Sequence, residues 1–126
     1  VEVVTGHYGD QYFTDLEESQ ISVNIHWSME NLDDFESGIF EAMAKGCVIV
    51  SERLNPKTVA DLDLQNAILE VDSPEEMKQT LQWLKENPAK IDEYRRRSLR
   101  AIAHNTWDDR ARLFLDTFTK TLDSRL

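Results

Sequence analysis

The sequence predicts an α/β fold, in which helices flank an open, four-stranded parallel sheet and the C-terminal third is helical. Three observations lead to this fold class. Short β-branched apolar runs alternate with helical patterns, the two central runs are almost continuously apolar, and the last third has helical periodicity. A strand that is apolar on both faces is typical of a parallel sheet covered by helices. We expect one domain over residues 1–126, because no linker, repeat or low-complexity tract interrupts the chain.

The predicted strands are the β-branched apolar runs. They are Val1–Val4, Ile21–His26, Cys47–Val50 and Ala67–Val71. Helical patterns lie between them, which predicts βαβ units, and such units are almost always right-handed.

Three helical segments are expected in the first half of the chain. Gln11–Glu18 and Glu36–Lys45 show apolar residues at helical spacing, and Thr58–Leu62 forms one turn after Pro56. Gly46 follows the second segment, where a left-handed cap is needed, and glycine adopts that conformation without strain.

The C-terminal third carries clear start signals for helices. Ser73 is expected to cap a helix with Pro74 at its first position, Asn87-Pro88 end that helix and start another, and Thr106 caps the last one. The expected inward-facing apolar residues are Met77, Leu81, Leu84, Ile91, Tyr94, Leu99, Ile102, Ala111, Phe114, Leu115, Phe118 and Leu122.

Charge and composition exclude several classes of protein. Acidic residues outnumber basic ones 24 to 14, for a formal charge of −10, so a nucleic-acid partner is not expected. The basic cluster Arg95–Arg97 is expected on an exposed helix face. No apolar stretch approaches the ~20 residues that a bilayer crossing needs, and Val1–Gly6 lacks the features of a signal peptide.

The few cysteine and histidine residues argue against disulfides and metals. Cys47 is the single cysteine, which excludes an internal disulfide and fits a cytoplasmic location. It and the scattered His7, His26 and His104 do not have the spacing of zinc ligands. We therefore expect no metal and no cofactor.

Four segments are candidates for a ligand site, because ligands of open parallel sheets bind outside the carboxyl ends of the strands. They are Thr5–Asp10, His26–Glu36, Ser51–Asn55 and Asp72-Ser73.

The helix that follows the second segment carries two informative residues. Gly38 in its first turn costs about 1 kcal/mol relative to alanine, so a ligand that approaches the backbone closely would explain it. Glu41 lies one turn later, where a carboxylate can accept hydrogen bonds from the vicinal hydroxyls of a ribose. The spacing alone favours a solvated Glu41 paired with Lys45 at i+4 over this role.

The run Phe35–Val50 resembles the signature of GT-B glycosyltransferases of the family-four type. In that signature two acids, separated by seven residues, precede a Glu-Ala-Met-Ala-x-Gly-x-Pro-Val-Val stretch. The order of elements on either side is similar to the C-terminal, Rossmann-like, nucleotide-sugar-binding domain of these enzymes. The residues before the acids, Asn24–Ser28, resemble the corresponding residues of a bacterial subgroup that builds surface polysaccharide.

The resemblance assigns roles residue by residue. Glu41 matches the acid that holds the ribose of the sugar nucleotide, and Asp33 matches the acid that contacts the transferred sugar, which makes it the catalytic candidate. The further predicted nucleotide-sugar-binding residues are Ser37, Gly38 and Ile39, through their backbone amides at the helix start, Tyr8 with His7 near the nucleobase, and His26 at a strand end. A structural role for His26 is equally open.

Parts of the resembled enzyme are missing. An arginine and a lysine that neutralise the diphosphate come from earlier βα units in that family, and the acceptor site comes from an N-terminal domain. The chain therefore resembles part of one domain of an enzyme that transfers sugar without metal from a nucleotide-sugar donor to a glycan acceptor. Alone it is expected to bind donor weakly and to be inactive.

Two other functions are found on folds of this kind. A non-catalytic interaction or dimerisation module would use apolar edges or the last helix, and a homodimer is one form that it would take. A phosphoacceptor receiver domain is disfavoured, because Thr5-Gly6 stand where the first strand would need an acidic pair.

Overall fold

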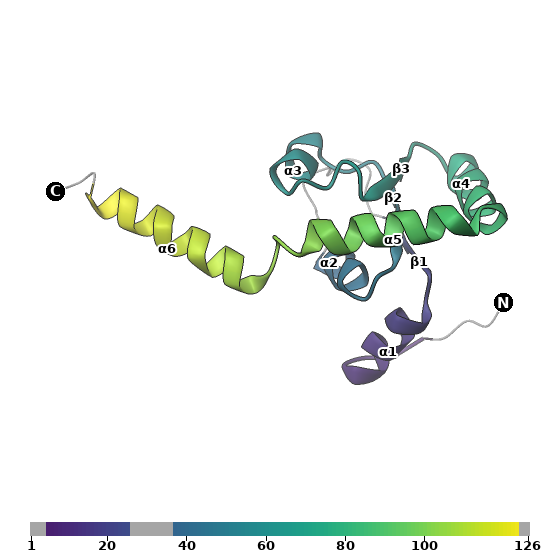
Figure 1. Ribbon diagram of the computed structural model, residues 1–126, viewed down its shortest axis with the longest axis horizontal. Coiled ribbons are helices and arrows are strands. Elements are labelled where there is room, and N and C mark those ends of the chain that lie inside the picture. The colour runs from purple at the N-terminus through teal and green to yellow at the C-terminus, as the bar shows by residue number, and fades with distance from the viewer. Residues whose placement is uncertain (1–4, 26–36, 124–126) are drawn as a thin grey trace.

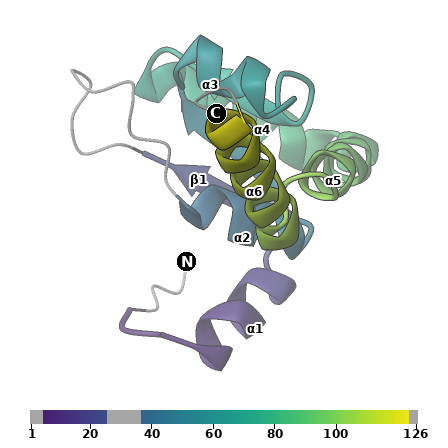
Figure 2. The same cartoon turned by 90° about the vertical axis from the view of Figure 1, so that its left-hand side faces the viewer.

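The computed structural model describes residues 5–25 and 37–123, and it shows a parallel sheet between helices (Figures 1 and 2). The strands are β1 (Ile21–Asn24), β2 (Val48–Glu52) and β3 (Ile68–Val71). They form a three-stranded sheet in the order β1-β2-β3, and both pairings are parallel. The open parallel sheet is confirmed for these strands, while the predicted strand at residues 1–4 lies outside the described residues.

The described helices alternate with the strands and then run on to the C-terminal end. They are α1 (Asp10–Glu18), α2 (Ser37–Ala44), α3 (Pro56–Asp61), α4 (Pro74–Glu86), α5 (Pro88–Ile102) and α6 (Trp107–Asp123). The cap predicted after α2 is confirmed, since Gly46 has a φ of 79° and the Cys47 amide donates to the Ala42 carbonyl at 2.9 Å.

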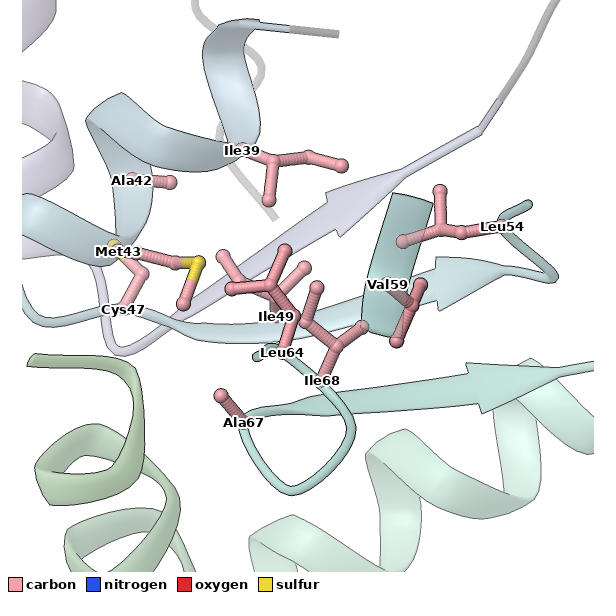
Figure 3. Close-up of a cluster of buried hydrophobic side chains, with 10 residues drawn as sticks. All are labelled: Ile39, Ala42, Met43, Cys47, Ile49, Leu54, Val59, Leu64, Ala67 and Ile68. Atoms are coloured by element: carbon pink, nitrogen blue, oxygen red, sulfur yellow. The ribbon is translucent and has the colours of Figure 1, made fainter. Parts of the chain in front are cut away.

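One face of the sheet is covered by α2 and α3. The buried cluster between them, which we call the α2-side core, is drawn in Figure 3. It contains Ile39, Ala42, Met43, Cys47, Ile49, Leu54, Val59, Leu64, Ala67 and Ile68. Leu16 of α1 packs against this core from outside.

The other face is covered by α4 and the first turns of α5. Its buried cluster, the α4-side core, contains Val48, Val50, Val71, Met77, Leu84 and Ile91. Ile49 therefore faces one core, while its neighbours Val48 and Val50 face the other. This confirms that the apolar run at β2 is a strand buried on both faces.

Side-chain caps start α3 and α4. The Asn55 side chain accepts the Lys57 amide at 2.9 Å, so α3 begins at Pro56 and not at Thr58 as predicted. At α4 the predicted Ser73 cap is confirmed, because its hydroxyl accepts the Glu76 amide at 3.1 Å.

Helix α5 crosses the edge of the sheet at which the strands begin, which we call the amino edge. Arg95 donates from Nε to the Gly46 carbonyl at 2.8 Å, and Arg97 donates to the Asn66 carbonyl and pairs with Glu93. The prediction of a plain exposed face for Arg95–Arg97 is thus wrong for two of its three residues. Leu99, predicted to face inward, is 46% exposed.

Helix α6 runs away from the rest of the molecule (Figure 1). None of its residues is buried, and Phe114 is 69% exposed. The predicted helix and its Thr106 cap are confirmed, with the Thr106 hydroxyl accepting the Asp109 amide at 3.2 Å. The predicted burial of its apolar face is wrong for the described chain. Within the part that the structure describes, no helix is long and apolar enough to cross a membrane.

Candidate functional site

The carboxyl edge of the sheet, where the strands end, begins with a buried polar contact. The Asn24 amide at the end of β1 donates to the Ser51 hydroxyl of β2 at 3.0 Å, and Ser51 donates to the Glu52 carbonyl at 2.7 Å. Both side chains are buried, so this bridge fixes the ends of the two strands relative to each other. Strand β1 ends at this bridge.

The first turn of α2 contains three of the predicted binding residues. Ser37 is exposed, Gly38 is half-buried, and the Ile39 side chain is only 2% exposed in the α2-side core. The first amides of a helix have no carbonyl partner within it, and they carry its partial positive charge. Burial of Ile39 therefore fixes a turn whose backbone is suited to an anion such as a diphosphate.

Glu41 lies one turn further along α2 and is half-buried. The alternative pairing with Lys45 is not what the structure shows, because Lys45 forms an ion pair with Glu17 of α1 and lies 5.5 Å from the Phe13 ring centroid. Glu41 lies instead near the Tyr12 hydroxyl of α1, whose pKa is raised first by burial and then by the negative charge of this carboxylate. Its position at the α1–α2 junction leaves it neither in the core nor fully in solvent.

Gly38 is not required by the packing of the described residues. A Cβ atom built on it would meet the Tyr12 hydroxyl at 3.9 Å, which is an ordinary van der Waals distance. Its φ lies outside the range that favours glycine, so alanine would fit both in space and in backbone conformation. The packing of residues 5–25 and 37–123 therefore does not account for a glycine in this turn, whereas close approach of a ligand would.

The remaining predicted residues are less closely tied to this turn. Tyr8 is 84% exposed in the segment before α1, so its contact with a nucleobase stays a prediction. Its neighbour His7 pairs through Nδ1 with Asp15 at 2.6 Å, and that hydrogen bond lowers the pKa of Asp15. His26 and Asp33 lie outside the described residues, and their roles also stay predictions.

The ends of β2 and β3 carry an ion pair that the sequence analysis did not predict. Arg53 follows β2 and binds both carboxylate oxygens of Asp72, which follows β3, at 2.7 and 2.6 Å. Glu70 accepts the Leu54 amide at 2.7 Å, and Glu76 accepts the Asp72 amide at 2.8 Å. Both partners fall in segments that the carboxyl-end rule had selected, but their pairing depends on β3 lying beside β2.

A hollow of about 540 Å³ lies at the opposite, amino edge, beside the loop that leads into β3. Its lining includes Asp61, Asp63, Arg97, Arg100 and His104. None of the predicted site residues belongs to it. Arg97 is already engaged there with Glu93 and with the Asn66 carbonyl, which indicates a structural contact.

No group of three or more histidine, cysteine or acidic side chains in residues 5–25 and 37–123 is arranged to hold a metal ion. The buried Cys47 thiol has a raised pKa because of its burial, so it is a neutral core side chain.

Comparison with known protein families matches the chain to the glycosyl transferase-like family over residues 2–116. The chain belongs to this family. No curated protein and no solved structure matches it. The match includes α1, the sheet, α2 and most of α6, and thus the whole turn that carries the candidate site.

Proposed function

We propose that this chain is the donor-binding part of a glycosyltransferase that moves a sugar from a nucleotide-sugar donor to a glycan acceptor in bacterial surface polysaccharide synthesis. The single observation that carries the proposal is the first half of α2. There an anchored helix start, a glycine that the packing of the described residues does not need and a half-buried carboxylate come together at the carboxyl edge. Membership in the glycosyl transferase-like family supports the reaction class.

Each group has a defined task in this proposal. The amides of Ser37, Gly38 and Ile39 face the diphosphate, whose charge complements the helix start without a net positive surface. Glu41 accepts hydrogen bonds from the ribose hydroxyls. Asp33 contacts the transferred sugar, and the transfer proceeds without a metal.

The proposed activity belongs to a whole enzyme, of which this chain supplies one part. The chain corresponds to part of a GT-B C-terminal domain, the acceptor binds to an N-terminal domain, and the protein acts in the cytoplasm. Transition-state stabilisation needs groups from both domains, so the chain alone binds donor weakly and does not turn it over.

The test is nucleotide binding by the 126-residue chain. A panel of UDP, GDP and dTDP sugars is screened by thermal shift, and the ligand that binds is titrated by NMR against Glu41→Ala. One charged hydrogen bond contributes about 1.5–3 kcal/mol, so we expect binding to weaken roughly 10- to 150-fold. Glu75→Ala, on the exposed first turn of α4, is the matched control.

Unchanged binding by Glu41→Ala would overturn the assignment of the ribose site. Absence of binding by the unaltered chain at millimolar nucleotide would overturn the donor-binding proposal as a whole.

A second candidate function is favoured by α6. Its apolar face, formed by Trp107, Phe114, Leu115, Phe118 and Leu122, is 48 to 89% exposed. Apolar patches of this kind mark interaction surfaces, so the alternative is a dimerisation module in which α6 packs on a second copy. Sedimentation at two protein concentrations tests it: a mass that rises towards the dimer supports the alternative, and a constant monomer mass contradicts it.

A further inference from the structure

Tyr12 of α1 lies at the candidate donor site. Its hydroxyl is 3.9 Å from the position of a Cβ on Gly38, and the Glu41 carboxylate, one turn further along the same helix, is close enough to raise its pKa. Two helices that are separate in the sequence thus bring a phenol, a carboxylate and the first turn of α2 together.

Other contacts hold α1 in place independently of this hydroxyl. Leu16 packs against the α2-side core, the Cys47 thiol donates to the Leu16 carbonyl at 3.3 Å, and Lys45 pairs with Glu17. The Tyr12 ring packs against Phe13, with ring centroids 5.5 Å apart. Removal of the hydroxyl alone should therefore leave α1 docked on α2.

The chemistry of a phenol suits a residue that orients a carboxylate. A phenol O–H can donate one hydrogen bond, and a carboxylate has acceptor sites to spare for further donors. Burial raises the pKa of Tyr12, and the nearby Glu41 carboxylate raises it further. The phenol thus stays protonated and remains a donor at physiological pH.

We propose that Tyr12 is a positioning residue of the donor site, whose hydroxyl holds the Glu41 carboxylate in place so that the ribose diol meets a preset acceptor. This inference rests on the proposed function, because it assumes that Glu41 receives the ribose. An acceptor that is already oriented loses less rotamer freedom when the ligand binds, and this lower cost appears as affinity.

The experiment compares Tyr12→Phe, Glu41→Gln and the double variant in NMR titrations with UDP, GDP and ADP. The nucleotide that binds is then compared with its 2′-deoxy form. A net hydrogen bond contributes about 0.5–1.5 kcal/mol, so Tyr12→Phe should weaken binding roughly 2- to 13-fold. The loss should be smaller for the 2′-deoxy nucleotide and should disappear in the Glu41→Gln background. Tyr94→Phe, on the α4-side core, is the matched control.

The outcomes separate this inference from the proposed function. If Glu41→Gln weakens binding and Tyr12→Phe does not, the positioning role is wrong and the proposed function stands. Equal losses from Tyr12→Phe with and without the Glu41 carboxylate would also overturn the positioning role. If neither variant changes the binding of a nucleotide that the unaltered chain does bind, the ribose site is wrong and both proposals fall. Circular dichroism melting of each variant confirms that the fold is retained.

Discussion

The two edges of the sheet are built in different ways. At the amino edge, α5 passes across the strand starts and its side chains bind backbone carbonyls, as Arg95 binds Gly46 and Ser98 binds Ala67. At the carboxyl edge lie the starts of α2, α3 and α4 and the exposed Arg53–Asp72 pair. Packing and hydrogen bonds from α5 hold the amino edge together, whereas the carboxyl edge presents amides and carboxylates.

This difference indicates how stability and binding are divided in the molecule. Side chains that satisfy buried backbone groups are costly to remove, while exposed ion pairs contribute little. Substitutions at the amino edge should therefore change the free energy of unfolding, and substitutions around the first turn of α2 should change ligand binding. The predictions below test that division, beginning with the largest expected effect.

The largest effect is expected from Leu64→Ala in the loop that leads into β3. Leu64 is fully buried in the α2-side core, so its truncation should lower the free energy of unfolding by about 2–5 kcal/mol. Chemical denaturation measures the loss. Leu113→Ala, at a residue that is 57% exposed on α6, should stay within about 0.5 kcal/mol. Similar losses for the two variants would mean that the amino-edge loop is not part of the core.

A smaller loss is expected for Asn105→Ala at the junction of α5 and α6. The Asn105 amide donates to the Leu62 carbonyl at 3.1 Å and to the Ala101 carbonyl at 2.9 Å, and its oxygen accepts from Arg110. Loss of these bonds should destabilise the chain by about 1–3 kcal/mol, measured by thermal and chemical unfolding. Thr121→Ala near the end of α6 is the control, and a greater loss there than at Asn105 would contradict the prediction.

A pH-dependent effect is expected at the carboxyl edge. The hydrogen bond and charge of Arg53 lower the pKa of Asp72 below its ordinary 3.8, so this carboxylate stabilises the fold above that value. The contribution is lost as the pH falls from about 4 through the lowered pKa. Asp72→Asn should therefore have a lower free energy of unfolding than the unaltered chain at neutral pH. The gap between the two free energies, measured by chemical denaturation, should narrow on acidification. Asp116→Asn on α6 is the control, and a gap that widens in acid would contradict this account.

Much of the fold could be predicted from the sequence because local chemistry determines it. The apolar runs at β1, β2 and β3, the Ser73 and Thr106 caps and the left-handed Gly46 are features of a few neighbouring residues. The start of α3 was placed too late, because proline was interpreted as preceding the helix when it occupies its first position.

The errors concern contacts between segments that are distant in the sequence. Arg95 and Arg97 were expected to be exposed, because their sequence neighbours do not indicate that α5 packs beside the Gly46 and Asn66 carbonyls, which accept hydrogen bonds from them. The periodicity of α6 predicts the helix correctly, but it does not show whether another segment packs on the apolar face of that helix.

The candidate site shows the same limit. Glu41 and Gly38 could be identified because the helix start and its motif are local. Tyr12 could not, because its hydroxyl reaches them only through the packing of α1 on α2. The pairing of Arg53 with Asp72 likewise required the order of β2 and β3.

The most direct test of the central claim is to measure both stability and nucleotide binding for Gly38→Ala. Alanine fits this position and favours the helix, so the free energy of unfolding should rise by about 0.4–1 kcal/mol. If the first turn of α2 receives a diphosphate, the added methyl group should at the same time weaken the binding of the nucleotide that the unaltered chain binds. A more stable variant that binds less nucleotide is the predicted result, and a more stable variant that binds it equally well would contradict the account.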